Sequence, residues 1–247
     1  MKNIIFISPK KFSQILLVVI GVLTLASIAG SFWRLASIDS YFFVKMRKSF
    51  IRLFDPNGEA NIIAWYSASA LLLCSFLLGI IALAKKADRD SYTLHWGILS
   101  LIFLYLSADE AAMLHEIADK PLRELLNLGG FFYYSWIIPA GIAVLIFGLA
   151  YVKFLLHLPS KTRWLFLLAG GIFVGGAIGL ESISGLLDHS YSQGRMASDE
   201  IVIIFETIEE FMEMVGIALF IYALLDYMSS HLQQVSFHIG NHKAVSQ

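Results

Sequence analysis

Long apolar blocks alternate with short polar segments along most of this chain. A bilayer crossing takes about 20 mostly apolar residues, and six blocks reach that length. They cover residues 14–33, 61–84, 94–114, 134–156, 164–187 and 201–228. In lipid only helices and closed barrels satisfy their backbone groups, and these blocks are too long and too uniformly apolar for barrel strands. The pattern therefore predicts a single all-α domain over residues 1–247, an integral membrane bundle of about six transmembrane helices.

Composition agrees with a multi-pass membrane protein. Of the 247 residues, 57% are hydrophobic and 15% are charged, which is far more apolar than a soluble domain of this length. The net charge of −1 offers no basic surface for nucleic acid. The single cysteine, Cys74, excludes an intrachain disulfide.

The first apolar block has two interpretations. Ser27, Ile28 and Ala29 resemble a signal-peptidase cleavage site, and lysines precede the block. The apolar run is long for a signal peptide and continues as far as Arg34. We therefore expect an uncleaved first span, with a cleaved signal as the alternative.

The segment 40–54 predicts a short amphipathic helix in the membrane interface. Lys45, Lys48 and Arg52 share one face, and aromatic and aliphatic residues cover the others. A re-entrant or packed connector is the alternative. With this segment set aside, Lys and Arg are more numerous in the loops on the side of the N-terminus, which predicts cytoplasmic termini in a bacterial-type plasma membrane.

Ionisable residues interrupt three of the apolar blocks, all at one end of the predicted bundle. They lie late in the third and fifth blocks and early in the sixth. Because successive spans alternate in direction, these positions fall in the same half of the membrane, the outer half when the N-terminus is inside. The candidate ligand residues are Asp109, His115, Glu116, Glu181, Glu206, Glu209, Glu210 and Glu213.

Helical spacing supports a shared site. At about 100° per residue, Glu206, Glu210 and Glu213 fall within one narrow arc. On a continuous third helix, Asp109 and Glu116 would be nearly eclipsed. Glu110 would point elsewhere, toward solvent or headgroups. Glycines in the fifth block at 171, 175 and 179 have small-xxx-small spacing and predict close packing beside Glu181.

Clustered carboxylates in a low dielectric require protonation, water or a bound cation. Carboxylate with imidazole suits zinc, iron or manganese, so we expect a divalent metal as the cofactor. The polar residues stop halfway along their helices, where a lipid-like substrate would approach from the side. The leading hypothesis is therefore a membrane-embedded metalloenzyme acting on such a substrate, with its catalytic residues unassigned. A cation or proton-coupled transporter, and a sensor or scaffold subunit of a membrane complex, are the alternatives.

Overall fold

The computed structural model describes residues 8–35, 41–56, 58, 60–193 and 199–232, and within these ranges it contains no strand. The elements are α1 (Pro9–Leu35), α2 (Tyr41–Phe54), α3 (Ile62–Ala87), α4 (Thr93–Ala112), α5 (Glu116–Leu126), η1 (Gly130–Phe132), α6 (Ile137–His157), α7 (Ser160–Val174), η2 (Gly175–Leu180), α8 (Glu181–Ser192) and α9 (Asp199–His231). The all-α class predicted from the sequence is confirmed.

Four helical segments are long and apolar enough to cross a membrane. They are Pro9–Trp33, Ile62–Ala87, Ile137–His157 and the continuous stretch Ser160–Ser192. The bent pair of α4 and α5 adds a fifth candidate crossing if the two helices are counted as one span. These lengths and compositions are those of a multi-pass membrane protein; the expected number of six crossings stays a prediction.

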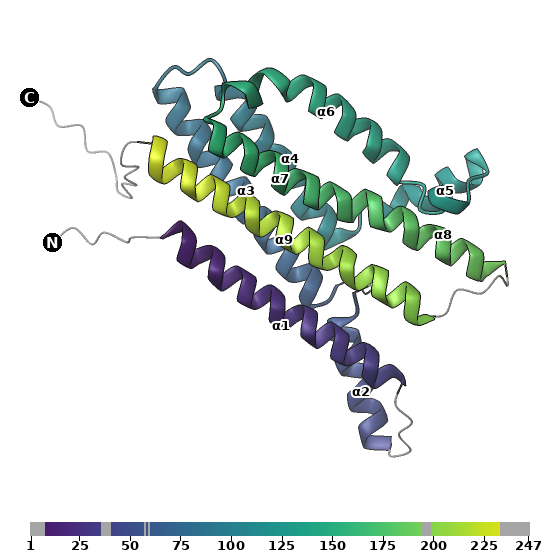
Figure 1. Cartoon of the computed structure of the whole chain (residues 1–247). Helices are drawn as coiled ribbons and strands as arrows, with labels where there is room; N and C mark the ends of the chain where they lie inside the picture. Colours follow the sequence, from purple (N-terminus) through teal and green to yellow (C-terminus); the bar gives the residue numbers. More distant parts are fainter. Residues whose placement is uncertain (1–7, 36–40, 57, 59, 194–198, 233–247) are drawn as a thin grey trace, which may run out of the picture.

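Helix α9 lies at the centre of the bundle. It packs against α1, α3 and the α7–η2–α8 helix, and α3 also packs along α4 (Figure 1). The C-terminal half of α9 supplies Ile221, Ala223 and Leu224, each fully buried. Around them, large side chains such as Trp96 and Phe154 complete a single core that joins α3, α4, α6, α7 and α9. This half of the bundle is consequently filled by apolar packing.

Serines join α3 to α4 inside the apolar region. The Ser75 hydroxyl donates to the Ser100 carbonyl oxygen at 2.7 Å, and the Ser100 hydroxyl donates back to the Ser75 carbonyl oxygen at 2.8 Å. Nearer the other end, Ser107 donates to the carbonyl oxygen of Ala68 at 2.8 Å. Small hydroxyl side chains allow the two backbones to approach closely and still satisfy their own polar atoms.

The third predicted span ends earlier than the sequence indicated. Met113 adopts a left-handed conformation with φ of 55°, which closes α4 at Ala112, and α5 then leaves at 84° to α4. The predicted span 94–114 was therefore too long, and the near-eclipsed placement of Asp109 and Glu116 was wrong, because the two residues belong to different helices. A single backbone conformation decides this and leaves no strong mark in the sequence.

The fifth span approaches α9 through adjacent glycines. Residues 175–180 form a π-helical turn. A Cβ atom at Gly176 would lie 3.1 Å from the Glu209 carbonyl oxygen and 3.2 Å from Cγ of Glu213. The predicted face of Gly171, Gly175 and Gly179 is confirmed only at Gly175, where a Cβ atom would lie 3.3 Å from Met212, since Cβ atoms at 171 and 179 would meet nothing within 4 Å. A π turn changes the residue repeat, so positions four apart no longer align.

Helix α2 confirms the helical part of the prediction for residues 40–54. Phe50 packs on α1, with its ring centroid 5.7 Å from that of Trp33, while Phe42 and Phe43 are exposed. Its place in the membrane interface stays a prediction. Residue 40 lies outside the described residues, as do three basic residues of the orientation argument, Lys2, Arg195 and Lys243.

Candidate functional site

The main cavity lies between α4, α6, the α7–η2–α8 helix and α9, and has a volume of about 250 Å³. All the residues that the sequence predicted as ligands line it: Asp109, His115, Glu116, Glu181, Glu206, Glu209, Glu210 and Glu213. They come from α4, the break after α4, α5, α8 and α9. The fold therefore brings separate parts of the chain to one space.

A second cavity of about 270 Å³ adjoins the main one. The two share part of their wall, made of His115, Glu116, Trp136, Glu181, Glu206 and Glu209. The second cavity extends under α5, where Asp119 and Lys120 line it. Residues of the shared wall can therefore act on a ligand in either space.

Glu110 is a site residue that the sequence analysis misplaced. It lines the main cavity together with Glu210 and Glu213, whereas we expected it to face solvent or headgroups. Leu106, Asp109, Glu110 and Met113 line the cavity with i, i+3, i+4, i+7 spacing, so one face of α4 carries both carboxylates. With Glu110 included, eight carboxylates and one histidine line the main cavity, and neither Lys nor Arg is among its described lining residues.

The acidic side chains line the cavity without forming a preassembled metal site. Glu206 is buried, whereas Glu181, Glu209, Glu210 and Glu213 are half-buried, as expected for side chains along a cavity wall. Within the described part of the chain, no group of three or more His, Cys, Asp or Glu side chains is arranged to hold one metal ion. Any ion here would require the long glutamate side chains to change rotamer.

Asp109 stabilises the break between α4 and α5. One carboxylate oxygen accepts the backbone N–H of His115 at 2.8 Å, and the other lies 3.1 Å from Nδ1 of the same histidine. The imidazole also lies against Trp136, with ring centroids 4.8 Å apart. Asp109 thus fixes the orientation of His115, in the way that carboxylates orient histidine ligands in metal sites.

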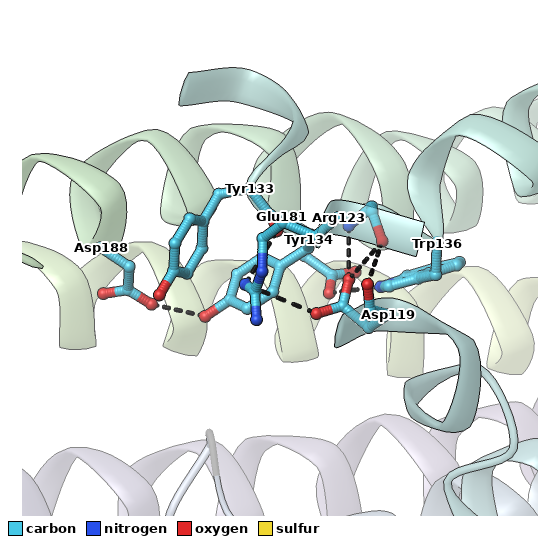
Figure 2. Close-up of polar contacts among 8 residues, drawn as sticks. Asp119, Arg123, Tyr133, Tyr134, Trp136, Glu181 and Asp188 are labelled. Atoms are coloured by element: carbon cyan, nitrogen blue, oxygen red, sulfur yellow. Dashed lines mark hydrogen bonds and ion pairs between the residues drawn. The ribbon is translucent and has the colours of Figure 1, made fainter. Parts of the chain in front are cut away.

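Two aromatic side chains from the α5–α6 connection hold acidic groups of α8 (Figure 2). Trp136 donates its indole N–H to Glu181 at 2.8 Å, and Tyr134 donates its hydroxyl to Asp188 at 2.5 Å. Burial and the hydrogen bond to Asp188 raise the pKa of Tyr134 well above its usual value, so the phenol remains a donor. The sequence analysis did not place these aromatics in the site. Their location beside the acidic end was the available signal for a role in the site.

Helix α5 is attached to the bundle by its polar face. Asp119 accepts the backbone N–H of Ser135 and lies 3.5 Å from the guanidinium of Arg123. Arg123 in turn donates to the Tyr133 carbonyl oxygen at 3.0 Å and stacks on the Tyr133 ring (Figure 2). These contacts bring the polar face of α5 over the second cavity.

His189 has a structural role outside the two cavities. It lies within α8, and its Nδ1 accepts the backbone N–H of Gly130 at 3.0 Å. It also packs against Tyr133, with ring centroids 5.6 Å apart. His189 therefore holds η1 against α8, and it is not among the described residues that line either cavity.

Replacing Asp119 by alanine is expected to loosen α5. The change leaves the buried Ser135 N–H without its carboxylate acceptor and removes the partner of Arg123, a loss of about 1–3 kcal/mol for charged hydrogen bonds. Backbone amides of α5 should then exchange with deuterium about tenfold faster or more, since about 1.4 kcal/mol is a factor of ten. Mass spectrometry of the full chain in detergent measures this. Glu124→Ala, an exposed carboxylate on the same helix, is the control; equal exchange in both variants would show that Asp119 does not hold α5.

Apolar side chains also line the main cavity. Leu106 comes from α4, Ala140 and Val144 from α6, and Phe173 and Ala177 from the α7–η2 helix. Helix α6 approaches the bundle mainly through bulky aromatics near its C-terminal end, Tyr151 and Phe154, and is otherwise largely exposed. The cavity is thus amphipathic, because its lining combines carboxylates with apolar side chains.

Fold and site together define a helical membrane protein with an acidic, amphipathic cavity at one end of its bundle. Residues 14–227 match the family described as a domain of unknown function, DUF8692, and the chain belongs to that family. Among curated proteins and among solved structures, nothing matches the chain.

Proposed function

We propose that this protein binds a divalent metal ion in the main cavity and acts as a membrane-embedded metalloenzyme on a lipid-like substrate. One observation carries the proposal: the ionisable residues of separate helices line a single cavity that apolar side chains also line. Eight carboxylates without a lysine or arginine among the described lining residues favour a cation as the guest, because like charges at this density repel one another in a low dielectric.

The carboxylates and His115 supply suitable donors for such an ion. Oxygen together with imidazole suits zinc, iron or manganese. Among the candidate ligands, those that line both cavities are the ones from which we expect the largest effect: His115, Glu116, Glu181, Glu206 and Glu209. Side-chain rotation of the flexible glutamates would bring them onto the ion, and Asp109 would orient the imidazole. When bound, the metal would activate water.

The apolar side chains that line the cavity support the proposal of a lipid-like substrate. A hydrocarbon chain could lie along Leu106, Val144 and Phe173 while its polar end reaches the carboxylates. The structure assigns no residue as the general base. The substrate class therefore follows from shape and polarity alone.

We also propose that the chain crosses the membrane six times, with both termini cytoplasmic in a bacterial-type plasma membrane. Helix α9 packs against α1, α3 and α7, which belong to segments that qualify as crossings, so its central position favours a sixth crossing. The bent α4–α5 pair would supply another, ending where α5 turns aside. Basic loop residues set the orientation.

Transport is the weaker proposal. A pathway would have to continue from the cavity through the other half of the bundle. That half holds Trp96, Phe154, Phe220 and Leu224 in one closely packed core. Packing of this kind favours a site that opens to one side of the membrane.

Elemental analysis of detergent-purified protein tests the metal. We expect stoichiometric zinc, iron or manganese that is lost on treatment with a chelator and recovered when the ion is added back. Acidification should also release it, because ligands must be deprotonated to bind. Protein free of any tightly bound metal, with no uptake of these ions on titration, would overturn the proposal.

A further inference from the structure

Helix α5 presents an apolar face that nothing in the described bundle covers. Ile117, Leu125 and Leu126 are 72%, 79% and 49% exposed. Together with Ala118, Pro121 and Leu122 they cover a broad face of about 180°, with Ile117 and Leu126 at its two edges. A short helix with three large aliphatic side chains so exposed requires an apolar environment.

The opposite face of α5 contacts other parts of the chain. Asp119 and Arg123 bind the connection before α6, and Glu116, Asp119 and Lys120 line the second cavity. The exposure of the apolar face is therefore a fixed property of the way α5 docks. One side faces the acidic space, and the other side faces outward.

The direction of α5 indicates what covers the apolar face. Helices α4 and α5 together pass as one bent membrane segment, with α5 at 84° to α4. If α4 crosses the bilayer, α5 runs along its surface at the level where α4 ends. Leu101, Leu104 and Tyr105 of α4 are also exposed. The apolar face of α5 therefore follows, along the chain, a helix that itself exposes apolar side chains.

We propose that α5, together with η1, docks in the lipid interface as a cover over the second cavity. Its aliphatic face lies among the upper acyl chains, and its charged face lies at headgroup level above the carboxylates. In η1, Phe131 and Phe132 are 53% and 47% exposed and extend the anchor. The occupant is the membrane surface, as for other interfacial amphipathic helices.

This proposal rests on the membrane location of the bundle and not on the metal. It places the cavity entrance beside the lipid headgroups, where amphiphilic ligands are concentrated. Metal binding could fail while α5 still lies in lipid, and α5 could be solvated while the cavity still binds a metal. The two proposals are therefore separable by experiment.

Spin labels on α5 in full-length protein reconstituted into phosphatidylcholine nanodiscs test the depth of each face. Leu125→Cys and Leu126→Cys report the apolar face, and Glu124→Cys, at an exposed polar position about 100° and 160° away around the helix, is the matched control. Cys74 is 0% exposed, so the introduced thiol is the accessible one among the described residues. Power-saturation spectroscopy compares collisions with oxygen, which concentrates in lipid, and with a polar nickel chelate.

We expect labels at 125 and 126 to collide more with oxygen than with the nickel chelate, and the label at 124 to show the reverse. Equal, chelate-dominated collisions at all three positions would overturn the proposal by showing a solvated helix. Protection of 125 and 126 from both reagents would also overturn it, since that result indicates cover by protein, such as a second copy of this chain.

Discussion

Glu181→Gln is expected to weaken divalent metal binding by about tenfold or more. Glu181 lines both cavities and accepts a hydrogen bond from the indole of Trp136. Glutamine has nearly the same shape, and its carbonyl oxygen can accept the same bond, so the orientation of Trp136 should be retained. What is lost is one negative charge and one ligand oxygen. Changes even outside the ligand shell cost about 10–100-fold in metal affinity.

Competition with a fluorescent chelator measures this affinity, and elemental analysis measures the amount of metal retained. Glu124→Gln removes the same charge from an exposed site on α5 and serves as the matched control. Equal affinity in wild type, Glu181→Gln and the control would show that Glu181 is not part of a metal site. A loss in Glu181→Gln with unchanged thermal stability would separate ligation from folding.

Gly216→Ala is expected to give the largest loss of stability. A Cβ atom at Gly216 would lie 2.9 Å from the backbone nitrogen of Phe173 and 3.0 Å from the carbonyl oxygen of Ala169. Both neighbours are backbone atoms of α7, so α7 and α9 must separate. Overpacking of this kind costs about 1–3 kcal/mol, or roughly 2–4 °C in melting temperature for each kcal/mol.

Fluorescence-monitored melting in detergent measures the shift. Gly170→Ala is the matched control, because a Cβ atom there would meet nothing within 4 Å and α7 is helical at that point. That variant should melt at or slightly above the wild-type temperature, since alanine favours helix over glycine. A melting temperature for Gly216→Ala equal to that of Gly170→Ala would show that the α7–α9 contact is looser than described.

The spacing of residues in the sequence was sufficient to predict much of the site, because each residue turns a helix by a nearly constant angle. The spacing of Glu206, Glu210 and Glu213 placed them on one face of α9, and all three line the main cavity. Alternating direction placed the late part of the fifth block at the same end, where Glu181 lies. These inferences required only helix geometry and the order of the blocks.

Contacts between distant segments could not be inferred in this way. The pairing of Trp136 with Glu181 and of Tyr134 with Asp188 depends on how the α5–α6 connection folds back on α8. Glu110 joined the cavity because the face of α4 that carries Leu106, Asp109 and Met113 also carries Glu110, and tertiary packing turns that face toward the cavity. A helix of uniformly apolar residues carries little information about which of its faces packs against which neighbour.

The sequence by itself determined the all-helical membrane class, the approximate bounds of the long helices and the gathering of carboxylates at one end, because apolar length and helical repeat are local properties of the chain. Only the tertiary structure decided that α4 breaks at Met113, that Gly175 and Gly176 rather than Gly171 and Gly179 meet α9, and that α5 turns across the bundle end. Those features depend on one left-handed residue, one π turn and the contacts of neighbouring helices, which are set by packing between segments distant in sequence.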